Sequence, residues 1–287
     1  MATRFWDHGA STGNLGTASN WSADTVPVAN DTVWFEGISS GSNIDTGLSS
    51  TLDNATLSGN LDALYISAAA TYAFGTDSAY LVVGVDECEI GFWRQQGSRP
   101  NGSPRLKLDF GNQATECRVY STAGTTTDTN LDPTRLLFNN SSARLDVYSD
   151  GSACRVGVAT TDPAETSTLG TLNVYGLTAG VTCGPGVALT TANVYGGNAL
   201  LQSAPTTANV RGGTLKITAY TGTVTNAEVK SGATLDIRGS NLTFTNPIEL
   251  HDGAILDARG FTGSLLGKLR FMGSGAVTIL TDAEVTV

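Results

Sequence analysis

The chain has 287 residues, a formal net charge of −10 and a charged fraction of 15%, which is below the share of about 25% in an average domain. An acidic chain with only 16 Lys and Arg residues is a poor candidate for binding nucleic acid or an anionic membrane, because both need clustered cations. The apolar fraction of 40% argues against disorder, and no run of 18 apolar residues is present to form a spanning helix. The 34 Gly, with Ser, Thr and Asn between the apolar residues, favour short strands joined by tight turns.

Residues 1–37 are predicted to form an N-terminal cap. Three of the four tryptophans fall in this segment, namely Trp6, Trp21 and Trp34. The first coil of a stacked structure has no neighbour on one side, and an uncovered strand edge invites aggregation. We therefore expect the aromatic side chains to cover that end, and we take the three tryptophans as candidate contacts for a partner.

The cap segment also carries a resemblance to a known class of proteins. Its residues follow the order Trp6, Asn20-Trp21, Pro27 and Asp31-x-Val33-x-Phe35. This order resembles the opening segment of bacterial extracellular parallel β-helix proteins, including autotransporter-type passenger repeats. The resemblance covers about the first 37 residues and implies a β-helix as the fold.

Residues 44–108 are predicted to form short strands, since their apolar residues alternate over short runs. Among these runs lies a polar, turn-rich stretch from Arg94 to Arg105 with a quarter of the twelve arginines of the chain. We interpret it as a protruding loop, either a solvated excursion or a contact arm for a partner surface. The candidate contacts in it are Arg94, Arg99 and Arg105.

A recurring phrase places Asp or Asn between two apolar residues. Its copies are Leu108-Asp109-Phe110, Leu145-Asp146-Val147, Leu172-Asn173-Val174, Leu235-Asp236-Ile237 and Leu256-Asp257-Ala258. Strand alternation puts the apolar residues inside and the polar residue outside. Because Asp236-Ile237-Arg238 and Asp257-Ala258-Arg259 are 21 residues apart, they are expected to stack as an exposed Asp/Arg ladder.

The stretch from Thr191 to Asp257 repeats itself. When Val194, Val210, Val229 and Leu250 are aligned, the steps between them are 16, 19 and 21 residues. Each copy continues through a glycine turn into a second apolar run, at Ala199–Leu201, Thr214–Ile217, Ala233–Ile237 and Ala254–Ala258.

A unit this short cannot bury its own apolar face, so it must stack on its neighbours. Apolar spacing near 2 and a repeat near 20 residues indicate strands rather than helical repeats, which need about 33 residues or more. The sequence predicts an all-β fold, a single-stranded parallel β-helix over residues 38–287 with coils of about 16–21 residues, behind an aromatic cap at residues 1–37.

The four cysteines are Cys88, Cys117, Cys154 and Cys183. Two of them share a local frame, Cys117-Arg118-Val119 and Cys154-Arg155-Val156, and Cys88-Glu89-Ile90 is similar. These frames predict cysteines at equivalent positions of nearby coils, facing the core. Buried free thiols are the first interpretation, with disulfides or a metal site as alternatives, although no Cys-x-x-Cys pair is present.

Candidate chemistry is sparse. Asp128-Thr129-Asn130-Leu131-Asp132 begins like a calcium loop, but Pro133 stands where such a loop needs glycine. The two histidines, His8 and His251, have no metal-binding motif beside them. Asp146 with Asp150 could line a catalytic groove of the kind found in glycan-cleaving enzymes. We predict no catalytic, metal or cofactor-binding residue.

The function predicted from the sequence is that of a non-enzymatic structural protein of a virion. The first interpretation is a capsid decoration or cement protein, or a short spike, of a tailed bacteriophage, located on the virion surface. It is expected to form a homotrimer and to bind the major capsid protein or another virion protein, with no nucleic acid or membrane as a partner. The lack of an apolar signal at the N-terminus favours this setting.

Two alternatives stay open. A secreted bacterial adhesin or surface-layer protein fits the resemblance of the cap, and a cell-surface glycan would then be a partner. A polysaccharide-degrading enzyme on the same scaffold is the third interpretation, and it requires a groove with clustered acidic residues and arginines.

Overall fold

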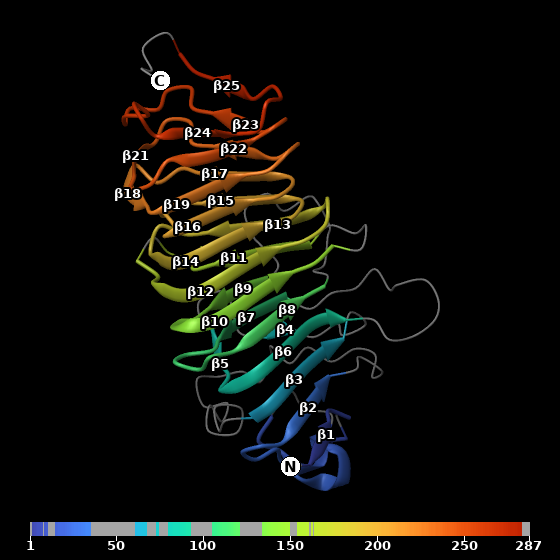
Figure 1. The fold of residues 1–287 in the computed structure, drawn as a ribbon. Helices are drawn as coiled ribbons and strands as arrows, with labels where there is room; N and C mark the ends of the chain where they lie inside the picture. Colours follow the sequence, from blue (N-terminus) through green and yellow to red (C-terminus); the bar gives the residue numbers. More distant parts are fainter. Residues whose placement is uncertain are drawn as a thin grey trace.

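The structure is a computed structural model that describes residues 2–7, 9–10, 15–35, 61–67, 73–74, 80–92, 105–120, 134–149, 154–160, 162 and 164–282. These residues form strands and two short 3₁₀ helices, η1 (Ala18–Asn20) and η2 (Ser22–Asp24). The strands stack as rungs from the N-terminus, in blue, to the C-terminal region, in red (Figure 1). None of the helices in the described ranges has the length and apolar character needed to span a bilayer.

The largest element is a sheet of 12 parallel strands, called the long sheet below. In spatial order its strands are β1 (Thr3–Phe5), β2 (Thr32–Phe35), β3 (Leu61–Ser67), β6 (Val85–Phe92), β8 (Glu116–Val119), β10 (Asn139–Val147), β12 (Ser167–Val174), β14 (Val187–Val194), β16 (Thr207–Val210), β19 (Asn226–Val229), β22 (Ile248–His251) and β24 (Leu269–Met272).

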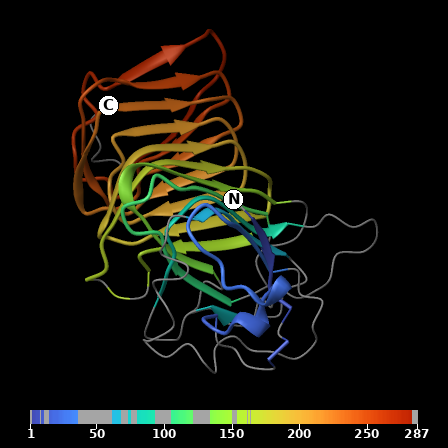
Figure 2. The ribbon, with the colours of Figure 1, turned by 90° about the horizontal axis from the view of Figure 1, so that it is seen from below.

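A second sheet of 11 parallel strands supplies the opposite wall. Its strands are β25 (Thr278–Leu280), β23 (Ile255–Asp257), β20 (Thr234–Asp236), β17 (Thr214–Ile217), β15 (Asn198–Leu201), β13 (Ala179–Cys183), β11 (Cys154–Val158), β9 (Thr134–Leu137), β7 (Arg105–Asp109) and β4 (Ala73–Phe74), with β5 (Leu81–Val82) also paired to β7. A short sheet joins β18 (Thr221–Val224) to β21 (Asn241–Phe244). The view from below shows the strands of successive coils running side by side (Figure 2).

The pairing confirms the predicted parallel β-helix. Val194 pairs with Val210, Val210 with Val229, and Val229 with Leu250, as the repeat predicts. The second strand of each unit pairs in the same way, with Leu215 between Ala199 and Leu235. Every pairing between the named strands is parallel, so each coil is hydrogen-bonded to the coils on either side of it.

The predicted coil length holds only for the C-terminal half. The inward-facing residues Phe35, Ile66, Ile90, Val119 and Val147 are register neighbours in the long sheet, at steps of 31, 24, 29 and 28 residues. Strands β3, β6 and β10 of these coils have 7, 8 and 9 residues, and further residues separate the described strands along the sequence. Because loop length is tolerated far better than a change in strand register, the periodicity is lost from the sequence without being lost from the fold.

The cap is built around tryptophan, as predicted. The ring centroids of Trp6 and Trp21 are 5.0 Å apart at an angle of 81°, and that of Phe35 is 5.7 Å from Trp21. The indole Nε1 of Trp21 donates a hydrogen bond of 2.7 Å to the carbonyl of Leu15, so its one polar atom is satisfied in the interior. Strands β1 and β2 continue the long sheet, which joins the cap to the solenoid through backbone hydrogen bonds.

The cysteines follow the prediction only in part. Cys88 and Cys117 are register partners in the long sheet, and both are buried. Burial raises the pKa of the Cys117 thiol well above its usual value, with Cys88 adding to the shift. Cys154 lies in β11 of the second sheet, so its frame is not equivalent to that of Cys117. All four cysteines are buried free thiols.

The predicted Asp/Arg ladder forms, but its carboxylates are shielded rather than exposed. Asp236 pairs with Asp257 in the second sheet. Each carboxylate binds the guanidinium two residues later, at 2.7 Å for both Asp236–Arg238 and Asp257–Arg259. The Asp side chains are 6% and 9% exposed, because they lie under the arginines, whose side chains are 44% and 49% exposed. The expectation that these aspartates face open solvent was wrong.

Candidate functional site

Polar side chains lie in ordered rows on the outer face of the long sheet. Strand alternation turns one residue in two away from the core, so equivalent positions of successive coils form rows along the solenoid. The central row starts with aromatic residues and ends with charged ones. In register order it contains Phe5, Trp34, Tyr65, Glu89, Arg118, Asp146, Asn173, Asn193, Asn209, Glu228, Glu249 and Arg270.

Three asparagines in this row form a hydrogen-bonded amide ladder, Asn173, Asn193 and Asn209. Asn173 Nδ2 donates to Asp146 Oδ1 at 2.6 Å, and Asn193 and Asn209 each donate to the preceding amide oxygen at 2.8 Å. Asp146 fixes the direction of the ladder, because an ionised carboxylate only accepts hydrogen bonds. Every amide therefore turns its NH₂ group toward the N-terminal end and its oxygen toward the C-terminal end.

Asp146 is held by a bidentate ion pair. Arg144 Nε lies 3.0 Å from Asp146 Oδ1, and Arg144 Nη2 lies 2.5 Å from Oδ2. This contact raises the pKa of the Arg144 guanidinium. The Asp146 side chain is 1% exposed, so the ladder begins at a shielded and fully paired charge.

A tyrosine stack runs beside the amide ladder, formed by Tyr120, Tyr148, Tyr175 and Tyr195. Successive ring centroids are 5.0, 4.8 and 4.8 Å apart, and the rings are within 13° of parallel. The Arg211 guanidinium lies 5.5 Å from the centroid of Tyr195 and closes the stack. Desolvation and the neighbouring Glu89 raise the pKa of Tyr120 to about 12.

The C-terminal end of the outer face is charged. Glu228 Oε1 is 2.5 Å from Lys230 Nζ and 3.1 Å from His251 Nε2, and Lys230 Nζ lies 3.0 Å from the same imidazole nitrogen. The hydrogen bond from Lys230 holds the pKa of the Glu228 carboxyl below its usual value. Glu249 Oε1 pairs with Arg270 Nη1 at 3.3 Å.

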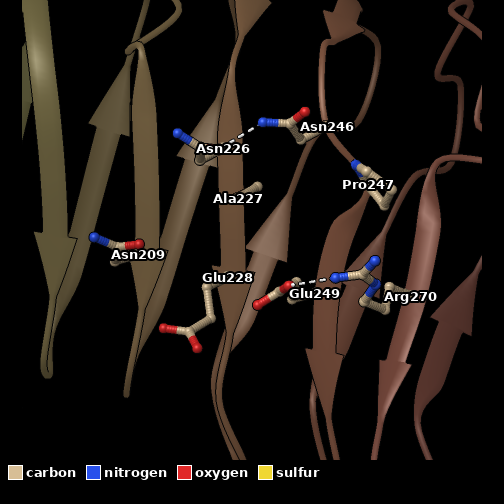
Figure 3. Close-up of a pocket in the computed structure, with 8 residues that line it drawn as sticks. All are labelled: Asn209, Asn226, Ala227, Glu228, Asn246, Pro247, Glu249 and Arg270. Carbon is tan, nitrogen blue, oxygen red and sulfur yellow. Dashed lines mark hydrogen bonds and ion pairs between the residues drawn. The ribbon is translucent and has the colours of Figure 1, made fainter.

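A groove of about 470 Å³ lies at this end, across β16, β19, β22 and β24. Its lining is mostly amide and charged side chains, with one proline: Asn209, Asn226, Ala227, Glu228, Asn246, Pro247, Glu249 and Arg270. Figure 3 shows Asn226 and Asn246 on one side, joined by a hydrogen bond of 2.8 Å, with Asn209 and Glu228 on neighbouring strands. This groove is the candidate site of the chain.

Three side chains of the charged end could approach a metal ion. The ligand atoms of Glu228, Glu249 and His251 lie within 4.8 Å of one another. The Lys230 ammonium, however, already bonds both Glu228 and His251. A cation entering there would have to displace that ammonium, so the arrangement is a hydrogen-bonded ion cluster.

The structure separates the three candidate tryptophans. Trp6 and Trp21 are 5% and 0% exposed, so their predicted contact with a partner gives way to a role inside the cap. Trp34 lies on the outer face instead, with its ring centroid 6.2 Å from Phe5 and 4.2 Å from Tyr65. Strand alternation explains the division, since Trp34 is flanked in β2 by the buried residues Val33 and Phe35.

The remaining candidates fall mostly outside the described residues. Arg94 and Arg99 lie there, as do His8, Asp150 and the stretch 128–132. Arg105 is the first residue of β7, so the predicted loop ends in a strand of the second sheet. His251 is in β22, in the ion cluster described above.

The amide ladder, the tyrosine stack and the groove were not predicted. A signal for the first two is visible in hindsight, because a Val-Tyr pair recurs at 119–120, 147–148, 174–175 and 194–195. The residue before each pair is Arg118, Asp146, Asn173 or Asn193, and these four residues belong to the central row. The groove left no such mark, since its residues come from four strands and from the connection between β21 and β22.

Comparisons with protein-family models, with curated proteins and with solved structures find no match to this chain. The outer face and its groove therefore have to be interpreted from their own chemistry.

Proposed function

We propose that this chain is a non-enzymatic structural protein of a virion surface, a capsid decoration or cement protein or a short spike of a tailed bacteriophage. The observation that carries the proposal is the outer face of the long sheet. Its polar side chains form hydrogen bonds with one another from coil to coil along the stack. Such an ordered face is suited to a structural protein with a long contact surface.

The protonation state of the groove supports a non-enzymatic role. A glycoside-cleaving site needs one carboxyl whose pKa is raised, so that it can donate a proton near neutral pH. Glu228 has a lowered pKa, since Lys230 and His251 stabilise its charged form. Glu249 is paired with Arg270. A carboxylate with a lowered pKa, such as that of Glu228, binds and positions ligands but does not protonate a leaving group.

The aromatic end of the outer face is the proposed partner contact. Phe5 is 40% exposed and stacks beside Trp34. Aromatic residues are enriched where protein interfaces bury their centre. We assign the major capsid protein or another virion protein to this contact, and a homotrimer to the free protein.

Two experiments test the proposal. Light scattering on the purified protein should give three times the mass of one chain, and a monomer contradicts the trimer. Immunogold electron microscopy with antibodies against the protein should label virus particles released from the source culture. Gold confined to bacterial cell walls overturns the virion setting in favour of a secreted adhesin or surface-layer protein, the alternative that the polar groove favours.

A further inference from the structure

We propose that the groove across β16, β19, β22 and β24 binds a neutral, extended glycan segment through its hydroxyl groups. This site goes beyond the virion proposal and does not rest on it.

The amide ladder ends at Asn209, whose side-chain oxygen faces the carboxylate of Glu228, and both groups accept hydrogen bonds. Asn209 gives its NH₂ group to Asn193, so its Oδ1 points to the next coil. The register partner there is Glu228, an ionised carboxylate that has no hydrogen to donate. Among the described residues nothing donates to Asn209 Oδ1, and Figure 3 shows this oxygen on the side of Asn209 that faces the strand of Glu228.

The rest of the groove offers both acceptors and donors. Glu228 and Glu249 each have one oxygen, Oε2, that takes part in no hydrogen bond between described residues. Asn246 donates to Asn226 Oδ1, which leaves Asn226 Nδ2 and Asn246 Oδ1 for a ligand. Arg270 is exposed and uses one guanidinium nitrogen on Glu249.

A sugar hydroxyl matches this set, because it donates one hydrogen bond and accepts others at the same time. Each hydroxyl can donate to Asn209 Oδ1 or to Glu228 while it accepts from Asn226 or Arg270. An acidic glycan is disfavoured, since two carboxylates line the groove and the chain has a net charge of −10.

The groove is also long enough along the solenoid axis for an extended ligand. Its four strands are adjacent rungs, spaced about 4.8 Å apart, so they span about 14 Å along the solenoid axis. The Asn226–Asn246 hydrogen bond and Pro247 lie along one side of it. A chain of sugars lying along the axis would meet equivalent polar groups on successive rungs.

Affinity electrophoresis of the purified protein in native gels tests the proposal, because it detects weak binding to polymers. Gels would contain galactomannan, arabinoxylan, glucomannan or dextran, with polygalacturonate as the acidic comparison. We expect at least one neutral polysaccharide to retard the protein and polygalacturonate not to do so.

Matched variants locate the binding. Asn209→Leu and Glu228→Gln should each weaken the retarding interaction about 3- to 10-fold, as expected for one lost hydrogen bond. Glu89→Gln is the matched control for Glu228→Gln, because it changes an ion-paired glutamate of the same row far from the groove. This control should bind like the parent protein. Circular dichroism would establish that each variant is folded. If Asn209→Leu does not fold, Glu228→Gln still tests the proposal.

Three results would overturn the proposal. They are no retardation by any neutral polysaccharide, equal losses in Glu228→Gln and Glu89→Gln, or stronger retardation by polygalacturonate. None of these bears on the immunogold labelling, so the glycan site and the virion setting can fail separately.

Discussion

The N-terminal cap and the periodic C-terminal coils bury their strands with different side chains. In the cap, strand β1 has a described neighbour on one side only, and the large rings of Trp6 and Trp21 fill the interior there. In the coils, Val210 is fully buried between Val194 and Val229, and small aliphatic residues are enough. The large aromatic side chains of the cap therefore bury the end of the stack, which a neighbouring coil does for the other strands.

The largest expected effect is a loss of the cap. Trp21→Ala should lower the free energy of unfolding by about 3–5 kcal/mol, because it empties a fully buried aromatic site and removes the hydrogen bond to Leu15. Trp34→Ala is the matched control on the outer face, where about 1 kcal/mol is expected. Urea denaturation followed by circular dichroism measures both, and similar losses would contradict the division between the two tryptophans.

The periodic coils should be most sensitive at a glycine turn. Gly213 and Gly239 have nearly the same left-handed backbone, with φ of +66° and +67°. An added Cβ at Gly213 would overlap the carbonyl oxygen of Gly197 in the adjacent coil, whereas nothing lies within 4 Å at Gly239. Gly239→Ala should therefore cost about 1 kcal/mol, the strain of the backbone alone, and Gly213→Ala about 3 kcal/mol.

Equal melting temperatures for the two glycine variants would show that the coils move apart freely. That outcome would contradict the close packing of one turn on the next in the periodic half.

Acid should weaken both regions through one carboxylate in each. Burial opposes ionisation of Asp31, but hydrogen bonds from the backbone of Ala2 and Val28 outweigh it and lower its pKa. The hydrogen bond from Arg259 lowers the pKa of Asp257. A lowered pKa gives stability that is present above the ordinary value of 3.8 and is lost as the pH falls through the folded-state value.

Asp31→Asn and Asp257→Asn should each lower the free energy of unfolding by about 1 kcal/mol at pH 7. The difference from the parent protein should shrink below about pH 4, where the parent carboxyls become protonated as well. Denaturation at several pH values measures this, and a constant difference down to the lowest pH would refute the assignment.

The smallest effect concerns the tyrosine stack, which lies between the two regions. Desolvation raises the pKa of Tyr120, Tyr148 and Tyr175, and that of Tyr120 reaches about 12. A raised tyrosine pKa gives stability that is present below about pH 10 and lost as the pH rises toward 12. Ultraviolet titration should show tyrosines ionising above the ordinary value of 10, and Tyr120→Phe should remove the highest step.

The periodic half could be predicted from the sequence almost residue by residue. Val194, Val210 and Val229 revealed their register because strand alternation and a coil of nearly constant length repeat the same letters. The aromatic cap could be predicted too, because clustered tryptophans of a strand-rich chain need an interior, but only Trp6 and Trp21 lie in it and Trp34 faces outward. The uneven spacing of the earlier coils concealed their register, so Cys154 was predicted at a position equivalent to Cys117, but it lies in the second sheet.

The sequence by itself determined the fold class, the alternation of buried and outward residues, and the register of the repeats, because these depend on local backbone geometry. Only the tertiary structure decided which outward residues meet. Asp146, Asn173, Asn193 and Asn209 form one directed ladder, and Glu228 follows it without a donor, because five separate segments stack in register. Hydrogen bonds between side chains of different coils depend on that stacking, so the recurring Val-Tyr pair marks part of the row but not the hydrogen bonds within it.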